Sequence, residues 1–260
     1  MKKKYITVLV ILLLGLIGLF YYYNDGKVRI LEEYSSSGKL IGTNEYIIRY
    51  GDTILQGKFV QYNEEGIKIA EGQFFENEPT GICSYYFDNG KIESVYYRKN
   101  SKIDLEVHYY YPNGLIRKYV MCNDLGEPKF IIEFDSTSVK RYTGYATYPV
   151  NQYKLVNNKQ VKIKNGDVLK VGDVIKHEYL LANIPNAKRI FKIEVEDVDS
   201  LKAKRSIIKE APARIIVEEV LTKKGLNRIK AITQYTFNDK TTQVKNDTVS
   251  FDIEVGNVPN

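Results

Sequence analysis

The chain contains no tryptophan, and only two histidines and two cysteines occur in its 260 residues. His108 and His177 have no spaced partner, whereas a zinc site needs three or four nitrogen or sulfur ligands, so the sequence predicts no metal site. Neither histidine has the positioned neighbour that general acid–base catalysis requires. The chain also lacks a phosphate-binding glycine loop and a serine nucleophile elbow. These absences predict a protein that is not an enzyme and binds no cofactor.

The scarcity of cysteine leaves two thiols to interpret, Cys83 and Cys122. Outside the cytosol they could form a disulfide. Cys83 takes an apolar position of its predicted hairpin, and Cys122 lies in the outgoing strand of the next unit. We therefore expect two free or buried thiols. The lack of tryptophan and of paired cysteines also separates the C-terminal half from true immunoglobulin domains.

Charge of one sign is not concentrated anywhere in the chain. The net charge is +6, from 38 Lys and Arg residues against 32 Asp and Glu residues, but the two signs are interleaved. No stretch presents the basic face that is typical of nucleic-acid binding. The sequence therefore predicts no nucleic-acid partner.

A five-residue phrase recurs through the first half of the chain at nearly fixed spacing. Each copy begins with tyrosine and ends with glycine, and the four glycines are Gly38, Gly66, Gly90 and Gly114. A worn copy follows at residues 134–138. Self-similarity at such a regular period indicates one supersecondary unit that is copied and stacked. Two of the glycines follow asparagine, the strongest short-range hairpin signal, so the four glycines are predicted to be turn residues in a series of β-hairpins.

Each copy also has an apolar residue seven positions before the glycine and the tyrosine four positions before it. These positions are three apart, so in a regular strand their side chains would face opposite sides of the sheet. Two interpretations remain open: a β-bulge lies between them, or both faces of the sheet carry apolar side chains. The 22 tyrosines favour strands in either case, because aromatic side chains suit a half-buried pleated surface.

One repeat carries a more specific motif. Glu71-Gly72 is followed by the aromatic Phe74, by Gly81 after a polar turn, and by Tyr86-Phe-Asp-Asn-Gly90 with a lysine after it. This pattern resembles the bacterial variant of the MORN repeat, and the similarity extends over about residues 29–142. The resemblance implies stacked hairpins that form a single-layer sheet and serve as a scaffold or interaction surface. Some bacterial members of the family are antitoxin-like.

The C-terminal half, residues 143–260, has a different pattern. Apolar and polar residues alternate in Phe191, Ile193 and Val195, and again in residues 229–237 and 249–255. About seven short half-buried strands separated by turn signals predict an immunoglobulin-like β-sandwich. Asn165-Gly166 is predicted to join two of the strands as a hairpin, and residues 202–211 are predicted to be a short helix or a long loop.

The segment 1–25 contains the one long apolar run. Three lysines precede the run, residues 6–20 are uncharged, and three tyrosines follow at positions 21–23, where an aromatic belt would lie. The run approaches the ~20 residues that cross a bilayer core. We therefore expect an uncleaved signal anchor, with a cytoplasmic N-terminus and the bulk of the chain in the periplasm or at the cell surface. A cleaved signal peptide and a buried core helix are the alternatives, and the bulky aromatics argue against cleavage.

These patterns predict an all-β fold with three parts: a transmembrane helix at residues 1–25, a stacked-hairpin MORN-like single-layer sheet at 27–142, and an immunoglobulin-like β-sandwich at 143–260. The predicted function is that of a bacterial, membrane-anchored envelope protein whose sheet and sandwich bind a protein or glycan partner. Aromatic residues are enriched in binding surfaces, so Tyr62, Tyr86 and Tyr110 are the predicted contacts unless they only brace the sheet. The alternatives are an antitoxin or immunity protein that neutralises a toxin, and a hydrolase, which would need Asp, Glu or His clustered in one pocket.

Overall fold

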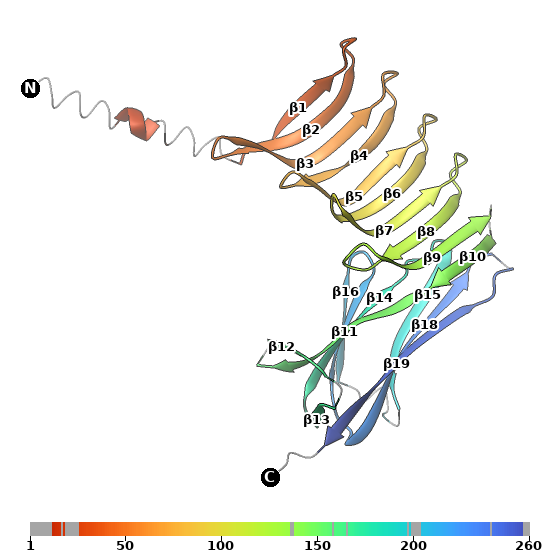
Figure 1. Cartoon of the computed structure of the whole chain (residues 1–260). Coiled ribbons are helices and arrows are strands. Elements are labelled where there is room, and N and C mark those ends of the chain that lie inside the picture. The colour runs from red at the N-terminus through yellow and green to blue at the C-terminus, as the bar shows by residue number, and fades with distance from the viewer. Residues whose placement is uncertain are drawn as a thin grey trace, which may run out of the picture. The chain divides into compact units, whose positions relative to one another are not determined.

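The computed structural model describes residues 12–16, 18, 26–135, 138–157, 159–164, 166–196, 198, 204–239 and 241–256 (Figure 1). The chain divides into two compact units. The first extends to Asp104 and includes Pro112–Gly114, and the second contains Leu105–Tyr111 and the chain from Leu115 onward. The predicted boundary between residues 142 and 143 stays a prediction.

The predicted transmembrane helix is wrong. Within the segment 1–25 the structure describes residues 12–16 and 18, and all of these are helical. No helix in the described part of the chain combines the length and the apolar character that a bilayer span of ~20 residues requires. The fold class is corrected on this point, and the membrane partner, the signal anchor and the single-pass localisation, which all depended on that helix, are wrong with it. The flanking residues 2–4 and 21–23 lie outside the described residues.

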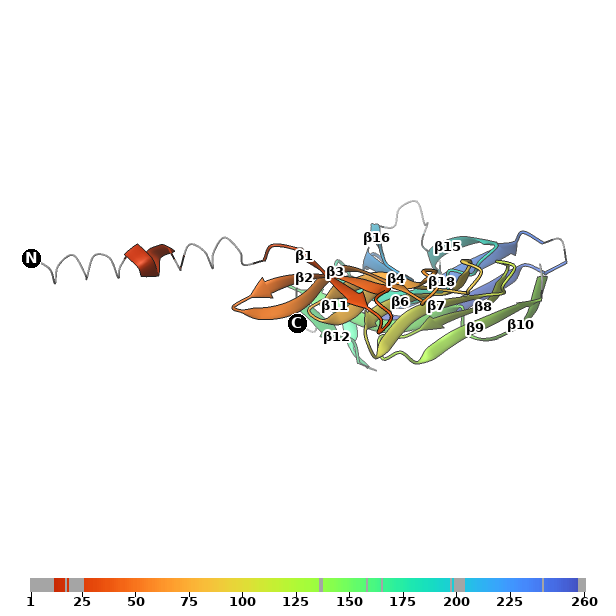
Figure 2. The ribbon, with the colours of Figure 1, turned by 90° about the horizontal axis from the view of Figure 1, so that it is seen from above.

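The first unit is a single layer of antiparallel strands in which each strand pairs with the next along the chain (Figures 1 and 2). Successive strands are joined by tight turns at both ends of the sheet. The strands are β1 (Arg29–Tyr34), β2 (Leu40–Arg49), β3 (Asp52–Tyr62), β4 (Lys68–Phe75), β5 (Glu78–Tyr86) and β6 (Ile92–Asn100).

The repeated glycines occupy turns with positive φ, which glycine adopts without steric cost. Their φ angles are 80° at Gly38, 79° at Gly66, 75° at Gly90 and 91° at Gly114. In the β5–β6 turn the Gly90 amide donates to the Phe87 carbonyl at 2.8 Å, and the Phe87 amide donates to the Lys91 carbonyl at 2.9 Å. This is a three-residue hairpin loop with a glycine bulge, so glycine alone, and not the asparagine before it, takes the left-handed conformation.

A β-bulge lies opposite the tyrosine of each repeat. The pairing register shifts at Glu33/Tyr34, Gln61/Tyr62, Tyr85/Tyr86 and Tyr109/Tyr110. In each case the extra, unpaired residue is on the following strand: Ile41, Ile69, Glu93 and Arg117. The strand that carries the tyrosine gains no residue between the apolar position and the tyrosine, so the first of the two interpretations left open by the repeat pattern is wrong.

The first unit has little buried apolar surface. Its buried cluster consists of Phe59, Ala70 and Cys83, with Phe74 packed on the Phe59 ring at a centroid distance of 4.8 Å. Gly72 lies between them, and a Cβ there would come within 2.7 Å of the Phe59 ring and 2.8 Å of the Cys83 sulfur. The glycine of the Glu71-Gly72 motif thus makes room for an aromatic ring on the neighbouring strand.

The second unit begins with four more antiparallel strands and continues into two packed sheets. Strands β7 to β10 pair in chain order, and the remaining strands form a five-stranded sheet, β12-β11-β14-β17-β16, and a four-stranded sheet, β13-β19-β18-β15. The bounds are β7 (Ile103–Tyr110), β8 (Ile116–Cys122), β9 (Pro128–Asp135), β10 (Ser138–Gly144), β11 (Thr147–Val156), β12 (Lys159–Lys162), β13 (Val168–Lys170), β14 (Val174–Leu181), β15 (Ala187–Val195), β16 (Arg205–Glu210), β17 (Arg214–Val220), β18 (Gly225–Phe237) and β19 (Lys245–Gly256).

Two predictions about the C-terminal half are wrong. Strands β12 and β13 belong to different sheets, because β12 pairs with β11 and β13 pairs in parallel with β19, so no hairpin joins them. Asn165, at the predicted turn, lies outside the described residues. Residues 205–210, predicted as helix or loop, form the edge strand β16.

Two apolar cores hold the second unit together. One lies between the two sheets and includes Ile175, Val217, Ile229 and Val255. The other is formed where one face of β8 and β9 covers residues of the sheets: Tyr119, Met121, Phe130 and Ile132 pack with Leu180, Ala182, Tyr235 and Phe237. The repeat strands of this unit therefore have one buried face and one outer face.

Candidate functional site

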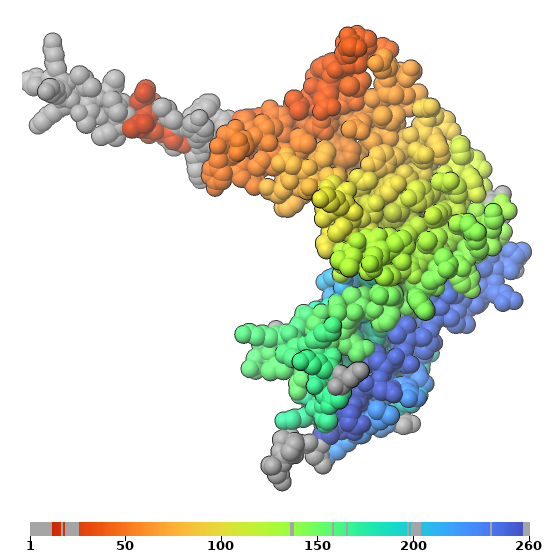
Figure 3. Space-filling view, viewed as in Figure 1, coloured from red at the N-terminus to blue at the C-terminus, as the bar shows by residue number. Residues whose placement is uncertain are grey.

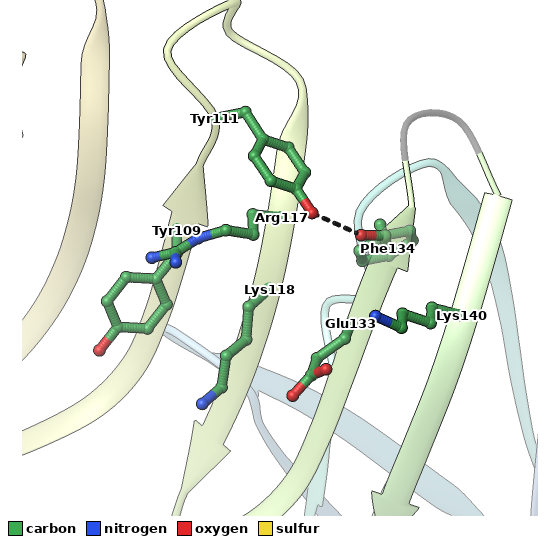
Figure 4. A pocket seen from close by; sticks show the side chains of 7 residues that line it. All are labelled: Tyr109, Tyr111, Arg117, Lys118, Glu133, Phe134 and Lys140. Atoms are coloured by element: carbon green, nitrogen blue, oxygen red, sulfur yellow. Dashed lines mark hydrogen bonds between the residues drawn. The ribbon is translucent and has the colours of Figure 1, made fainter.

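A hollow of about 400 Å³ opens on the outer face of strands β7 to β10. In β9, Phe130, Ile132 and Phe134 are buried in the core, so the alternation of a strand turns Glu133 to the opposite face. Part of the segment that forms these strands, coloured green, is visible at the molecular surface in Figure 3. The hollow is lined by Tyr109, Tyr111, Arg117, Lys118, Glu133, Phe134 and Lys140 (Figure 4).

Cross-strand pairing arranges the polar residues of this face in one row. Tyr109 lies opposite Lys118, and Lys118 lies opposite Glu133. Arg141 completes the row on the other side of Glu133. Side chains opposite each other on one face are close neighbours. The adjacent row is apolar except for its last member, and it consists of Val107, Val120, Ile131 and Thr143.

Two β-bulges each add a cation to the charged row. The β7–β8 register passes from Tyr110 opposite Ile116 to Tyr109 opposite Lys118, which leaves Arg117 unpaired in the ladder. The β9–β10 register likewise skips Lys140. Bulges re-aim side chains, and both skipped residues line the hollow.

A second hollow of about 320 Å³ adjoins the first and shares Lys118 and Glu133 with it. Its other lining residues are Ile131, Arg141, Tyr142 and Thr143. The two hollows together bring four cations, on β8 and β10, to either side of one carboxylate on β9. We call this surface, formed by Arg117, Lys118, Glu133, Lys140 and Arg141 with the tyrosines beside them, the basic face.

The charges of the basic face are only partly neutralised. Arg141 donates to Glu133 through Nε at 2.8 Å and through Nη2 at 3.0 Å. This pair, together with the nearby Lys118 and Lys140, holds the pKa of Glu133 below its usual value. Within the described residues, no ion pair involves Arg117, Lys118 or Lys140. The surface therefore favours an anion.

The two tyrosines of the first hollow are held in place. The Arg117 guanidinium lies 5.6 Å and the Lys118 ammonium 5.8 Å from the centre of the Tyr109 ring, within the range of cation–π attraction. The Tyr111 hydroxyl donates to the Phe134 carbonyl at 3.2 Å (Figure 4). The hollow is thus preorganised rather than assembled from free side chains.

The tyrosines predicted as contacts lie elsewhere and do not come together. Tyr62 is half-buried in the first unit. Tyr86, also in that unit, donates its hydroxyl to Glu71, and the Lys68 ammonium lies 4.3 Å from the centre of its ring. Tyr110, in the second unit, packs on the core below the basic face. Their role as contacts stays a prediction.

The histidines and cysteines do not line the hollows: His177 and both cysteines are buried, and His108 is half-buried. His108 packs on Tyr119 at a centroid distance of 4.9 Å, and burial lowers its pKa. His177 is buried beside Tyr179, and burial lowers its pKa to about 3. Cys83 and Cys122 are buried thiols that no disulfide joins, as expected. Among the described residues, no group of His, Cys, Asp and Glu could hold a metal ion.

A buried polar cluster links β7 and β8 to the sandwich within the second unit. Glu106 accepts hydrogen bonds from the Tyr119 hydroxyl and, at 3.0 Å, from Asn183 Nδ2, both through Oε1. The Tyr119 hydroxyl in turn accepts from the Asn183 amide at 2.7 Å. Arg189 donates to Asn183 Oδ1 at 3.0 Å. Burial raises the pKa of Glu106, and the hydrogen bonds only partly oppose this effect.

Comparison with known proteins identifies no family. No family model and no curated protein matches the chain. Among solved structures, a point mutant of S. aureus TarM in complex with Fondaparinux, alpha-GlcNAc-glycerol and UDP is 13% identical over 57% of this chain, with a TM-score of 0.25. A second TarM structure is 12% identical with a TM-score of 0.22. The chain spans only 24% and 23% of the length of those chains, and similarity at this level carries no argument about fold or function.

The residues of the basic face were not predicted as a site. Their signal in the sequence is the pair of cation doublets, Arg117-Lys118 and Lys140-Arg141, about one repeat period apart. In regular strands each doublet would divide its side chains between the two faces. The doublets meet on one face only because a bulge falls inside each of them, and neither bulge could be placed from the residue pattern alone.

Proposed function

We propose that this chain is a binding protein whose contact surface is the basic face of β7 to β10. The observation that supports this proposal is the pair of adjoining hollows, which gather four cations around a single carboxylate. Positive charge concentrated in a concave, partly preorganised surface raises the local concentration of an oppositely charged partner. Binding requires no chemistry beyond this arrangement.

The same geometry favours binding over hydrolysis. Glu133 is the one carboxylate among the residues that line the two hollows. A general acid needs a raised pKa, whereas Arg141 holds the pKa of Glu133 low. Glu133 is thus suited to accept hydrogen bonds from a ligand. The antitoxin function and the resemblance to the bacterial MORN variant stay predictions.

The test is a comparison of the full chain with a variant that lacks three cations of the basic face. We would screen both against an immobilised panel of neutral glycans, anionic glycans and peptides. The variant is Arg117→Ala, Lys118→Ala and Lys140→Ala, which leaves the Glu133–Arg141 pair in place. We expect the full chain to bind at least one panel member and the variant to bind it at least about tenfold more weakly, since charge-assisted hydrogen bonds are lost.

A matched control removes the same amount of charge elsewhere in the second unit. Lys159, Lys162 and Lys188 are exposed on β12 and β15, and their replacement by alanine should leave binding unchanged. Equal thermal unfolding midpoints would show that both variants are folded. Panel binding that is the same in the basic-face variant as in the unmodified chain would overturn the proposed function.

A further inference from the structure

We infer that the ligand of the basic face is an anionic glycan, a carbohydrate chain that carries carboxylate or phosphate groups. This inference rests on the proposed function and assigns it a ligand class. Three features of the basic face favour that class of ligand: the placement of the cations, the Glu133 carboxylate between them, and the scarcity of accessible apolar surface.

The cations require acidic groups on the ligand at more than one place. Arg117 and Lys118 lie on β8, and Lys140 and Arg141 lie on β10, with β9 between them. Neighbouring strands are about 4.8 Å apart, so the two doublets are separated by about 10 Å across the sheet. Both doublets contribute to each hollow: Arg117, Lys118 and Lys140 line the first, and Lys118 and Arg141 line the second. A single small anion fills one hollow, whereas a chain with repeated acidic groups can place one acidic group in each.

The carboxylate between the cations distinguishes a glycan from a simple polyanion. Glu133 stays ionised because Arg141 binds both of its oxygens. It repels a ligand that offers only negative charge, but each carboxylate oxygen retains capacity to accept a further hydrogen bond. Sugar hydroxyls are such donors. A ligand that carries hydroxyls beside acidic groups satisfies the cations and Glu133 together.

The lining of the hollows argues against an acidic protein segment as the ligand. Protein hot spots are side chains that bind in well-packed pockets from which water is fully excluded. Phe134 contributes little apolar surface to the first hollow because its side chain is only 3% exposed. The second hollow has Ile131 as its one aliphatic hydrophobic residue. Tyrosine, by contrast, presents both a ring face and a hydroxyl to a sugar, and three tyrosines line the two hollows.

The experiment measures the affinity of the full chain for soluble probes by calorimetry at one fixed salt concentration. The anionic glycan probes are oligogalacturonate, which carries carboxylates, and a mannose phosphate oligomer, which carries phosphates, so the two arms distinguish the source of the charge. Neutral galactan oligomers, polyglutamate and a single-stranded oligonucleotide are the comparison probes. We expect one anionic glycan to bind at least about tenfold more tightly than each comparison probe, and to lose that affinity when Arg117, Lys118 and Lys140 are replaced by alanine.

Every other outcome overturns either the glycan inference or the proposed function. If a neutral glycan or polyglutamate binds best and the triple variant abolishes that binding, the proposed function stands and the glycan inference is overturned. An oligonucleotide that binds as tightly as the glycans overturns the inference as well and contradicts the predicted absence of a nucleic-acid partner. Binding that the triple variant does not change contradicts the proposed function itself. Failure of every probe to bind overturns the inference.

A second variant tests the acceptor role of Glu133. Glu133→Gln removes the negative charge and keeps the size of the side chain. Binding of polyglutamate should strengthen because repulsion is lost, while binding of the anionic glycan gains less because a charged acceptor for hydroxyls is lost. We expect the ratio of the two association constants to shift by about tenfold against the glycan. An unchanged ratio would show that Glu133 does not contribute to the choice of ligand.

Discussion

At the scale of the residue, Gly72 shows why a repeat motif contains glycine outside any turn. Its backbone has ordinary φ, so conformational freedom is not the reason. The absent side chain is the reason, because the Phe59 ring and the Cys83 sulfur occupy the space where a Cβ would lie. An aromatic ring laid across a strand glycine is a known means of fixing register.

Replacing Gly72 by alanine is expected to lower the free energy of unfolding of the first unit by about 1–3 kcal/mol, because overpacking forces neighbouring side chains to move. Urea unfolding followed by circular dichroism measures the change. In a Phe59→Leu background, where the ring is gone, the same substitution should cost clearly less. Equal costs in both backgrounds would show that the ring contact is not responsible.

At the same scale, the buried carboxyl of Glu106 predicts how the stability of the protein depends on pH. Burial raises the folded-state pKa of Glu106 above its unfolded value of about 4.3. Below the unfolded pKa, both states hold the proton and stability does not depend on this group. As pH rises further, the unfolded state releases its proton first, so the protein loses stability until pH passes the folded pKa.

The variant Glu106→Gln should therefore be more stable than the unmodified protein at pH 7, and this advantage should vanish near pH 4. The glutamine oxygen can keep both hydrogen bonds, since Tyr119 and Asn183 donate to the same oxygen of Glu106. Glu106→Ala, the control, should lose about 1–3 kcal/mol at either pH because buried donors lose their partner. Thermal midpoints across pH measure both. A less stable glutamine variant at pH 7 would show that the charge is favourably bound.

At the scale of the element, we expect the β-bulge in β10 to place Lys140 without being needed for the pairing of the rest of the strand. Val139 lies opposite Phe134 and Arg141 opposite Glu133, with Lys140 skipped between them. Deleting Lys140 should make these pairs consecutive and leave the register of the rest of the strand intact. Stability should change by no more than about 1 kcal/mol, while ligand affinity should fall as far as in Lys140→Ala.

Deletion of Val139 is the matched control for this prediction. It shortens β10 by the same length but removes a side chain that packs on the core of the second unit. We therefore expect a marked loss of stability, measured by thermal unfolding. If deletion of Lys140 is as destabilising as deletion of Val139, the bulge is needed for folding and not only for placing a cation.

The hairpin elements also show where the sequence was sufficient and where it was not. The spacing of Gly66, Gly90 and Gly114 predicted the turns, because positive φ is a local demand that glycine meets. Strands such as β14 and β17 were predicted from their apolar runs. Strand β16 was not predicted, because the adjacent residues Ile207 and Ile208 within it break the alternation of apolar and polar residues. In the structure both side chains are 46% exposed. The basic face depends on bulges and cross-strand register, which are set by pairing between distant residues.

At the scale of the whole molecule, the two units differ in how much apolar surface they bury. The described residues of the first unit include four buried hydrophobic side chains, those of Ile47, Phe59, Ala70 and Cys83. The second unit has two large clusters. Hydrophobic burial dominates folding free energy, so the first unit should be the less stable of the two.

The buried thiols report on this difference, because each unit contains one of them. On heating with a thiol reagent, Cys83 should react at a temperature at least about 5 °C below that at which Cys122 reacts. Burial raises the pKa of Cys83, so it reacts slowly while its unit is folded. The single-cysteine variants Cys83→Ala and Cys122→Ala assign the two signals. Simultaneous labelling would show that the chain unfolds as one cooperative body.

The glycine-marked hairpin has a consequence for how this kind of protein changes over evolutionary time. A module such as 67–90 starts after one turn glycine and ends at the next. Excision or duplication of this module by recombination joins equivalent positions of two repeats. Every junction therefore remains a turn glycine followed by the start of a strand. Sheet length is thus a heritable quantity that can be reset in whole steps, independently of the strands that carry the basic face.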